Sequence, residues 1–345
     1  MKLSIVILCW NDRKVIHDAL RSIFETTRDL LFEVIVSDNG STDDSVEHIQ
    51  RCFPHPNLQI VRNHANLGFS KGNNAGIAAA KGQYVLILNP DTIIHQEALK
   101  KLVDFADQHP EAGAFGCRVL NPDGTYQKTA MVFPTVGRLW LHALGLHRLG
   151  RYWRPFLSRT YVGWDGDSER EIDWHSGCCV MFRRNLLNQL GGFDPRFFYH
   201  CEEVDLCFRV QKAGHKVLFT PHANITHLGG QSVKRAPIRF ALETHRSFYR
   251  YFYKHYGEVG VRRIKMPIVL LLLRHWLQAA ARCCFRPSEA TREGLKTLQI
   301  ELKWNLRLDP LRFAVSQEEP QLGFAPMAPA VAAPIRDIVN PSQQR

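Results

Sequence analysis

The sequence lacks an uninterrupted apolar stretch long enough to cross a membrane. Its longest such run, residues 267–273, is followed by Arg274 and His275, whereas a spanning helix needs about 20 predominantly apolar residues. A signal-peptide pattern is also missing, because Met1 and Lys2 lead into only a short apolar run with no small-residue cleavage site. These absences predict a cytoplasmic protein without a clear transmembrane helix.

Several common site patterns are absent as well. The chain has nine cysteines, an odd number, and no two of them are spaced as CxxC. This favours reduced thiols over a disulfide framework and argues against structural zinc. Neither GxGxxG nor GxxxxGK[ST] occurs, so standard dinucleotide and P-loop sites are disfavoured.

Positive charge is in excess. The 345 residues carry a formal net charge of +11, and 45% of them are apolar. The apolar content is ordinary for a chain with a substantial core, while the charge predicts an anionic partner: a nucleotide, a nucleic acid or an acidic membrane surface. Nucleic acid is disfavoured, because the basic residues are spread out and no known nucleic-acid-binding module occurs.

The first 120 residues alternate between strand and helix patterns. Strands are predicted over residues 3–8, 32–37, 58–63, 84–88 and 114–120, with helices between them. Asn11 is expected to cap the first helix, and Pro221 to end a later strand over residues 216–220. The series predicts an α/β fold with a mostly parallel central sheet flanked by helices.

Polar side chains follow each of the first four predicted strands. They lie in residues 10–12, 38–41, 63–72 and 89–91. Ligands of open α/β sheets bind at the carboxyl ends of the strands, so four such loops together predict a binding site there. A single loop of this kind would say little, because Asn, Asp and Gly are normal loop residues.

For two of these residues, a structural or surface role explains the sequence as well as a role in ligand binding does. Asp38 can accept a hydrogen bond from a base N–H or a ribose hydroxyl, or it can form an Asx turn. Lys71, in the turn that opens the third helix, can meet a phosphate at that helix N-terminus, or it can lie solvated on the surface.

Asp91 is the stronger candidate for chemistry. Asn89 and the rigid Pro90 precede it, directly after a hydrophobic strand. A carboxylate held there can bind Mg²⁺ or Mn²⁺ together with substrate phosphates. The alternative is an N-cap for a helix that begins near His95.

A second group of acids, Glu202, Glu203 and Asp205, stands at the start of a predicted helix. Helix capping explains one acid there, but it explains two adjacent glutamates less well. A carboxylate of this kind can act as a general base when it lies within reach of the proton that it removes. His227, on a Gly-rich loop, is either a metal ligand or a structural or exposed histidine.

Seven segments carry a resemblance to a known family. They are SIVILCWN (4–11), VSDNGSTDDS (36–45), NHANLGFSKGNNAG (63–76), LNPDT (88–92), WHSGCCVMFRR (174–184), GGFDPRFFYHCEEVD (191–205) and HLGGQS (227–232). In this order, over residues 3–232, they resemble the family 2 glycosyltransferases of the GT-A fold, and especially their bacterial rhamnosyltransferase-like branch.

The resemblance implies a nucleotide-diphosphate sugar donor and residues that bind it. Asp38 would recognise the nucleotide, and Trp10, Asn11 and Asn66 would line the same pocket. Lys71 and Asn89 are also expected to contact the donor.

The resemblance also implies a metal site. Asp91 resembles the last acid of the family's Asp-x-Asp motif, in which Asn89 replaces the first acid. His227 resembles an additional metal or diphosphate ligand.

A single inverting displacement is the implied mechanism. Glu203 stands where the family's Glu-Asp pair carries its base, and because it is one methylene longer than Asp, Glu202 remains an alternative base. The base takes the acceptor proton, and the oxygen attacks opposite the leaving diphosphate. Mg²⁺ or Mn²⁺ held by Asp91 and His227 neutralises the leaving group.

The acceptor is expected to be a saccharide or a lipid-linked saccharide of cell-surface polysaccharide synthesis, and rhamnose is the sugar that the branch suggests. Trp174 and His175 are acceptor-side candidates, with core packing as the alternative. Basic residues flank an apolar run within residues 262–286. This pattern predicts a helix on the inner face of an anionic membrane, or one packed on the catalytic domain.

Three parts are expected along the chain. Residues 1–235 form the catalytic domain, with a nucleotide-binding half over about 1–120 and an acceptor-side half over about 121–235. Residues 236–314 form a helical, basic extension, and residues 315–345 a disordered tail.

Two other functions are open at this point. A sugar nucleotidyltransferase usually carries a Gly-rich, basic loop after its first strand, and residues 9–12 are not such a loop. A non-catalytic, nucleotide-sugar-binding partner subunit is left open by Glu203 in place of Asp, although Asp91 and His227 argue against it.

Overall fold

The computed structural model describes residues 1–146, 161, 164–229 and 237–315. Its strands are β1 (Leu3–Cys9), β2 (Phe32–Asp38), β3 (Leu58–Arg62), β4 (Tyr84–Leu88), β5 (Thr92–Ile94), β6 (Ala112–Leu120), β7 (Ala130–Met131), β8 (Arg170–Glu171), β9 (Trp174–His175), β10 (Cys179–Arg183) and β11 (Lys216–His227). Its helices are α1 (Ile16–Thr26), α2 (Ser45–Cys52), α3 (Gly68–Ala79), α4 (Ala98–Gln108), α5 (Val136–Ala143), α6 (Arg184–Gln189), α7 (Glu202–Lys212), α8 (Pro237–Phe285), α9 (Glu289–Arg307) and α10 (Pro310–Val315). The predicted disordered tail, from residue 316 on, lies outside the described residues.

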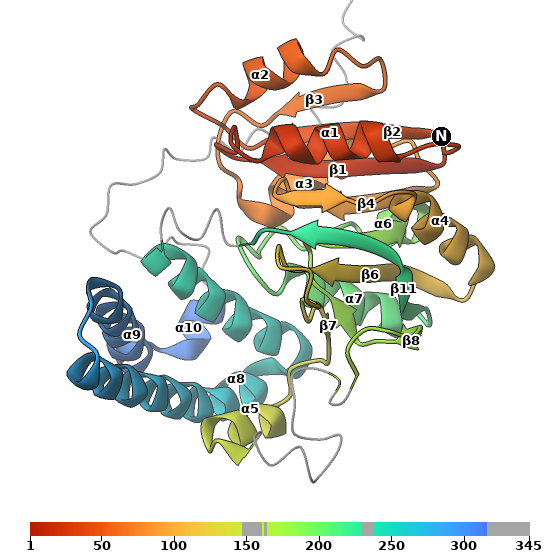
Figure 1. Cartoon of the computed structure of the whole chain (residues 1–345). Coiled ribbons are helices and arrows are strands. Elements are labelled where there is room, and N and C mark those ends of the chain that lie inside the picture. Colours follow the sequence, from red (N-terminus) through yellow and green to blue (C-terminus); the bar gives the residue numbers. More distant parts are fainter. Residues whose placement is uncertain (147–160, 162–163, 230–236, 316–345) are drawn as a thin grey trace, which may run out of the picture.

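A nine-stranded sheet forms the centre of the molecule (Figure 1). The strand order is β3-β2-β1-β4-β10-β6-β11-β5, and β8 pairs with β11. Strands β3, β2, β1 and β4 are parallel to one another, whereas β10 runs antiparallel between β4 and β6. The first half of the chain thus has the predicted parallel sheet, and the second half extends it with strands of both directions.

Helices cover both faces of this sheet. Along β1, Leu3, Ile5 and Ile7 point into one apolar cluster with residues of α1, α2 and α4. Val6 points the other way, into a cluster with residues of α3, α6 and α7. This alternation is the period-two pattern of a strand buried on both sides, and the resulting three layers confirm the predicted α/β fold class.

The strand order places a switch point beside β1. The chain runs outward from β1 to β2 and β3, and β4 then returns to the opposite side of β1. Loops that leave the carboxyl ends of β1 and β4 therefore diverge and leave a crevice between them.

Two local predictions are wrong. Strand β11 does not end at Pro221: its pairing with β6 shifts between Thr220 and Asn224, and the proline is accommodated in this irregularity, where its missing N–H breaks no ladder. Asn11 does not cap α1, which begins after Val15. Its Oδ1 instead accepts the backbone N–H groups of Thr42 and Asp43, at 2.7 and 3.2 Å, and thus ties the loop after β1 to the loop after β2.

The C-terminal helices build a third apolar cluster beside the sheet. Residues of α5, α8, α9 and α10 pack together there with Phe197 and Val204 (Figure 1). Helix α8 has 49 residues and bends at Gly257, where φ is 64°. An 18-residue window of it reaches a mean hydropathy of 1.4, so by length and composition α8 could cross a membrane. This finding does not overturn the prediction of no clear transmembrane helix, because it rests on length and composition alone.

Candidate functional site

A pocket of about 220 Å³ lies at the carboxyl edge of the sheet, at the switch point between β1 and β4. Loops after β1, β2 and β4 form one wall, and the start of α7 with the chain before it forms another. The predicted site residues that line it are Trp10, Asn66, Asn89, Asp91, Glu202, Glu203 and His227. The fold thus brings together residues from both halves of the chain.

Asp91 and His227 meet on the wall beside β4. Their Oδ1 and Nε2 atoms are 3.3 Å apart, and both side chains are largely buried. The N-cap alternative for Asp91 is excluded, because β5 follows it and α4 begins only at Ala98. His227 reaches this position because β11 continues past its bulge.

Hydrogen bonds orient the imidazole of His227. Its Nδ1 donates to Oε1 of Gln127 at 2.7 Å. Gln127 is itself oriented, because its Nε2 donates to Oδ1 of Asn121 at 2.9 Å. The lone pair on His227 Nε2 therefore faces Asp91 and the amide of Asn89, which lies 3.3 Å away. A carboxylate oxygen beside an imidazole nitrogen whose outer N–H is held in this way fits a divalent cation.

Glu202 and Glu203 open α7 on the opposite wall. His200 and Cys201, just before them, have φ values of 64° and 66°. Two consecutive non-glycine residues in the left-handed region cost about 1–3 kcal/mol each and persist only where the surroundings enforce them. The tight reversal puts both glutamates in the first turn of the helix, facing the pocket, where the helix dipole favours negative charge.

Burial raises the pKa of both glutamates, which suits groups that exchange protons near neutral pH. Burial raises the pKa of Glu203 to about 7, and the backbone N–H of Gly177 partly offsets this effect. Burial and the neighbouring Glu203 raise the pKa of Glu202 well above its usual range. The Oε2 atom of each is buried and has no hydrogen-bond partner among the residues that the structure describes. Buried polar atoms are normally paired, so two unpaired carboxyl oxygens in one pocket indicate a site for a substrate.

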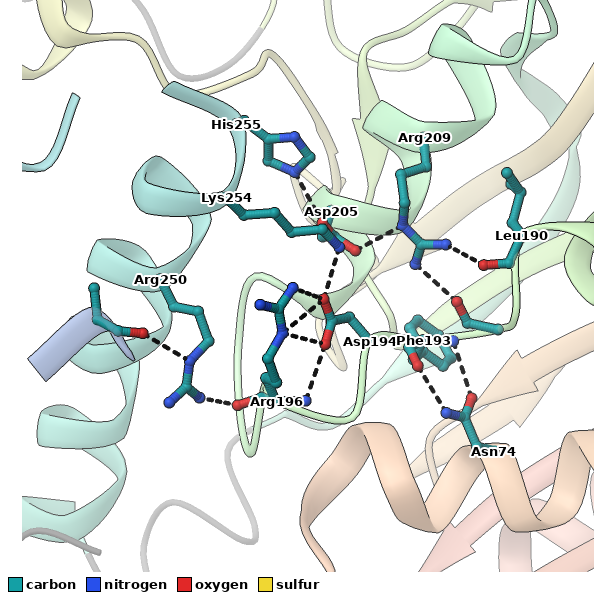
Figure 2. A network of polar contacts seen from close by, with 12 residues as sticks. Asn74, Leu190, Phe193, Asp194, Arg196, Asp205, Arg209, Arg250, Lys254 and His255 are labelled. Atoms are coloured by element: carbon teal, nitrogen blue, oxygen red, sulfur yellow. Dashed lines mark hydrogen bonds and ion pairs between the residues drawn. The ribbon is translucent and has the colours of Figure 1, made fainter. Parts of the chain in front are cut away.

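A network of ion pairs holds α7 against α8 (Figure 2). Asp205 is fully buried and accepts from Arg209, Lys254 and His255 at 2.6–2.8 Å. Burial alone would raise the pKa of Asp205, but these partners outweigh it and hold the pKa below its usual range. Lys254 also pairs with Asp194 at 2.7 Å. Asp205 therefore fixes α7, the helix that presents Glu202 and Glu203 to the pocket.

Amide side chains fix the loops after β2 and β3, which border the pocket. Asn39 donates to Oδ1 of Asn66 at 3.0 Å and accepts the N–H of Leu67 at 3.0 Å. At Gly40, with φ 75°, a Cβ would lie 2.7 Å from the backbone of Ala65. Only glycine permits this close approach of the loops after β2 and β3.

Three predicted donor-binding residues do not line the pocket. Asp38 is buried, and its Oδ1 accepts the N–H of Ser41 at 3.1 Å, as in an Asx turn. Asn11 joins two loops, and Lys71 is exposed on α3. Their roles in donor binding remain predictions.

The two acceptor-side candidates lie outside the pocket as well. His175 is fully buried, and its Nε2 lies 3.0 Å from both Thr129 Oγ1 and the carbonyl of Cys117. Burial lowers its pKa to about 4. Trp174 is partly buried and donates to the carbonyl of Val132 at 3.1 Å. The core-packing alternative therefore describes His175, which has no surface to offer an acceptor.

The pocket also contains residues that the sequence prediction did not assign to the site individually. They are Leu8, Asp12, Asn39, Gly68, Phe69, Pro90, Ser176, Gly177, Cys178, Phe198, Tyr199, His200 and Phe240. Most lie inside the recognised motifs, so motif position was a usable signal for them. Phe240, on α8, gave no such signal, because its place depends on how α8 packs beside α7. Part of the predicted Gly-rich loop, residues 230–232, lies outside the described residues.

Comparison with known proteins agrees with this geometry. The model of the family described as "Glycosyl transferase family 2" matches residues 4–191. The N-acetylglucosaminyl-diphospho-decaprenol L-rhamnosyltransferase of Mycobacterium tuberculosis is 33% identical over 230 residues, which cover 63% of this chain and 73% of the relative. The rhamnosyltransferase WbbL of Escherichia coli is 24% identical over 222 residues, or 61% and 79% of the two chains.

Solved structures share the fold at low sequence identity. GalNAc-T7 with UDP, GalNAc and Mn²⁺ aligns with a TM-score of 0.57 and 14% identity, over 93% of this chain and 58% of that one. The mannosyltransferase PcManGT of Pyrobaculum calidifontis, with GDP-Man and Mn²⁺, aligns with a TM-score of 0.51 and 15% identity, over 88% and 87%. These likenesses support the GT-A fold.

Proposed function

Because the chain belongs to glycosyltransferase family 2, we propose that it is an inverting, metal-dependent enzyme that transfers a sugar from a nucleotide diphosphate to a saccharide hydroxyl. The observation that carries this proposal is that one pocket contains both a pair of residues suited to a cation and two acids suited to proton transfer. Asp91 and His227 form a cation-binding edge, and Glu202 and Glu203 bring unpaired carboxyl oxygens to the other wall. Family membership also sets aside the sugar nucleotidyltransferase alternative.

The proposed cation is Mg²⁺ or Mn²⁺, held by Asp91 Oδ1 and His227 Nε2. Two protein ligands suit these ions, which take the rest of their oxygen ligands from substrate phosphates and water. Bound there, the cation would supply positive charge to the departing diphosphate. Gln127 would keep the His227 tautomer that offers Nε2.

Glu203 is the proposed general base. Its pKa of about 7 leaves a substantial fraction ionised at neutral pH, yet its ionised form remains basic enough to take a proton. The N–H of Gly177 holds the carboxylate, and Oε2 would receive the acceptor proton. The acceptor oxygen then attacks the anomeric carbon from the side opposite the diphosphate, so the configuration inverts. Burial and Glu203 raise the pKa of Glu202, which favours its protonated form beside an ionised Glu203.

The relatives suggest the substrates. One is named as a rhamnosyltransferase that acts on N-acetylglucosaminyl-diphospho-decaprenol. We therefore propose rhamnose as the donor sugar and a lipid-diphosphate-linked saccharide as the acceptor, in cell-surface polysaccharide synthesis on the cytoplasmic face of the membrane. In this proposal residues 1–235 are catalytic and residues 236–314 are the extension that contacts the lipid side.

Donor hydrolysis tests the proposal. Purified protein would be offered a panel of UDP-, dTDP- and GDP-sugars with Mg²⁺ or Mn²⁺, with nucleoside diphosphate release as the readout. We expect metal-dependent release from one donor and its loss in Asp91→Ala, but not in Asp123→Ala, a change on an exposed turn. Failure to bind any of these donors in calorimetry would instead favour a non-catalytic role.

A further inference from the structure

The second half of α8 carries two opposite apolar faces. Ile264, Ile268 and Leu272 recur every fourth residue and are buried in the cluster with α5, α9 and α10. At 100° per residue, the exposed residues Met266, Leu273 and Leu277 lie roughly on the opposite side of the helix.

These exposed residues belong to a continuous stripe. We call the apolar stripe the residues Val259, Met266, Leu270, Leu273, Leu277 and Phe285. Met266 is 58% exposed, Leu277 54% and Phe285 86%. At 1.5 Å per residue the stripe is roughly 40 Å long. Exposed apolar surface of this extent marks an interaction site.

Charge identifies the occupant. Residues 259–288 contain six Lys or Arg and no Asp or Glu. Lys265 and Arg274 bond to backbone carbonyls of the protein, whereas Arg262, Arg263 and Arg282 are exposed. A second copy of this surface would bring like charges together, while an anionic bilayer offers an apolar interior beneath a negative surface.

We infer that the apolar stripe lies in the interface of an anionic lipid bilayer, with the flanking arginines at the headgroups, and that α8 does not span the membrane. The buried face argues against spanning, because insertion would pull Ile264, Ile268 and Leu272 out of their cluster. Phe240, on the first half of the same helix, lines the pocket. Helix α8 therefore connects the bilayer to the site. Binding to the bilayer does not depend on the proposed function, but the reason for this connection does, because it rests on the proposed lipid-linked acceptor.

Flotation with vesicles tests the inference without donor or acceptor. The full chain should float with phosphatidylcholine vesicles that contain phosphatidylglycerol, and at least about thirtyfold less with pure phosphatidylcholine. Met266→Gln/Leu277→Gln should weaken the partition constant at least tenfold. Leu31→Gln, which changes a 74% exposed leucine in the catalytic domain, should leave it unchanged.

A charge-matched pair separates a local effect from a net-charge effect. Arg262→Gln/Arg263→Gln should weaken binding about thirtyfold, because each basic residue near the surface contributes about fivefold. Arg51→Gln/Lys101→Gln removes the same charge from exposed positions on α2 and α4 and should cost less than threefold. All variants should release nucleoside diphosphate from the donor at the wild-type rate.

Three results would overturn the inference: no flotation of the wild type at low salt, an equal loss in the stripe and control variants, or a stripe variant that halves the mass in light scattering. The last result would mean that a second copy covers the stripe. None of them bears on donor hydrolysis, so failure here leaves the proposed function standing.

Discussion

The two walls of the pocket are built differently. The wall that carries Asp91 is called the donor wall here, after the function proposed for it, and its polar side chains lie in loops that follow strands and are fixed by amides such as Asn39 and Asn66. The opposite wall is called the acceptor wall, and its Glu202 and Glu203 depend on the packing of α7 against α8, through Asp205 and residues about 50 positions away. The donor wall should therefore be robust to changes in the C-terminal helices, and the acceptor wall should be sensitive to them.

The largest expected effect separates chemistry from donor binding. Glu203→Gln should lower kcat for transfer about a thousandfold, because the base is lost. The Kd of the donor should change less than threefold, since the donor wall is untouched. Single-turnover kinetics and calorimetry measure the two quantities, and Glu202→Gln is the control. A larger loss of kcat in Glu202→Gln would exchange the roles of the two acids.

Removing the charge that joins α7 to α8 should destabilise the fold and leave the affinity for the donor unchanged. Asp205→Asn leaves Arg209, Lys254 and His255 without their buried anion, so the free energy of unfolding should fall by about 3 kcal/mol. The donor Kd should stay near the wild-type value. Chemical denaturation provides the measurement.

The control for that change is a surface pair of the same kind. Asp104→Asn breaks an exposed pair with Lys100 and should cost less than about 1 kcal/mol. Equal losses in Asp205→Asn and Asp104→Asn would remove the distinction between the two walls.

Removing the side chain that orients His227 should weaken the affinity for the metal and leave the chemical step unchanged. Gln127→Leu removes the acceptor of His227 Nδ1–H, so the Kd for Mn²⁺ should rise about tenfold to a hundredfold. Saturating Mn²⁺ should restore kcat. Lys128→Ala, at the exposed neighbour, should leave the Kd unchanged. A kcat that stays low at saturating Mn²⁺ would assign Gln127 a different role.

The smallest effect is the pH dependence, and its sign is fixed. Transfer needs ionised Glu203, so kcat/KM should rise about tenfold between pH 6 and pH 8, around a pKa of about 7. Stability should change in the opposite direction. A carboxyl whose pKa is raised above its usual value stabilises the fold at low pH, and this contribution is lost as the pH rises from the usual pKa of a glutamate to about 7. The stability of Glu203→Gln relative to the wild type should therefore increase over this pH range. A flat pH profile would contradict the assignment.

The sequence predicted the donor wall well for a local reason. A buried apolar strand followed by a polar turn is visible in a few consecutive residues, and parallel strands bring their carboxyl ends to one edge. Trp10, Asn66, Asn89 and Asp91 therefore fell in the pocket as predicted. The same reasoning could not tell Asp38 as a ligand from Asp38 as an Asx-turn residue, because both use the same loop position.

The second half of the chain was less predictable than the first because its geometry depends on distant contacts. Nothing near His175 signals that its ring is enclosed by Cys117 and Thr129. The bulge at Pro221 likewise depends on pairing with β6, about 100 residues earlier. The role of Asp205 became clear only with α8 in place.

Donor affinity with and without Mn²⁺ tests the central claim most directly, namely that Asp91 and His227 hold the cation while Glu203 acts only on the acceptor. Calorimetry of the preferred donor would compare the wild type, Asp91→Asn and Glu203→Gln. We predict that Mn²⁺ tightens binding at least tenfold in the wild type and in Glu203→Gln, and less than twofold in Asp91→Asn. An undiminished Mn²⁺ effect in Asp91→Asn would contradict the account.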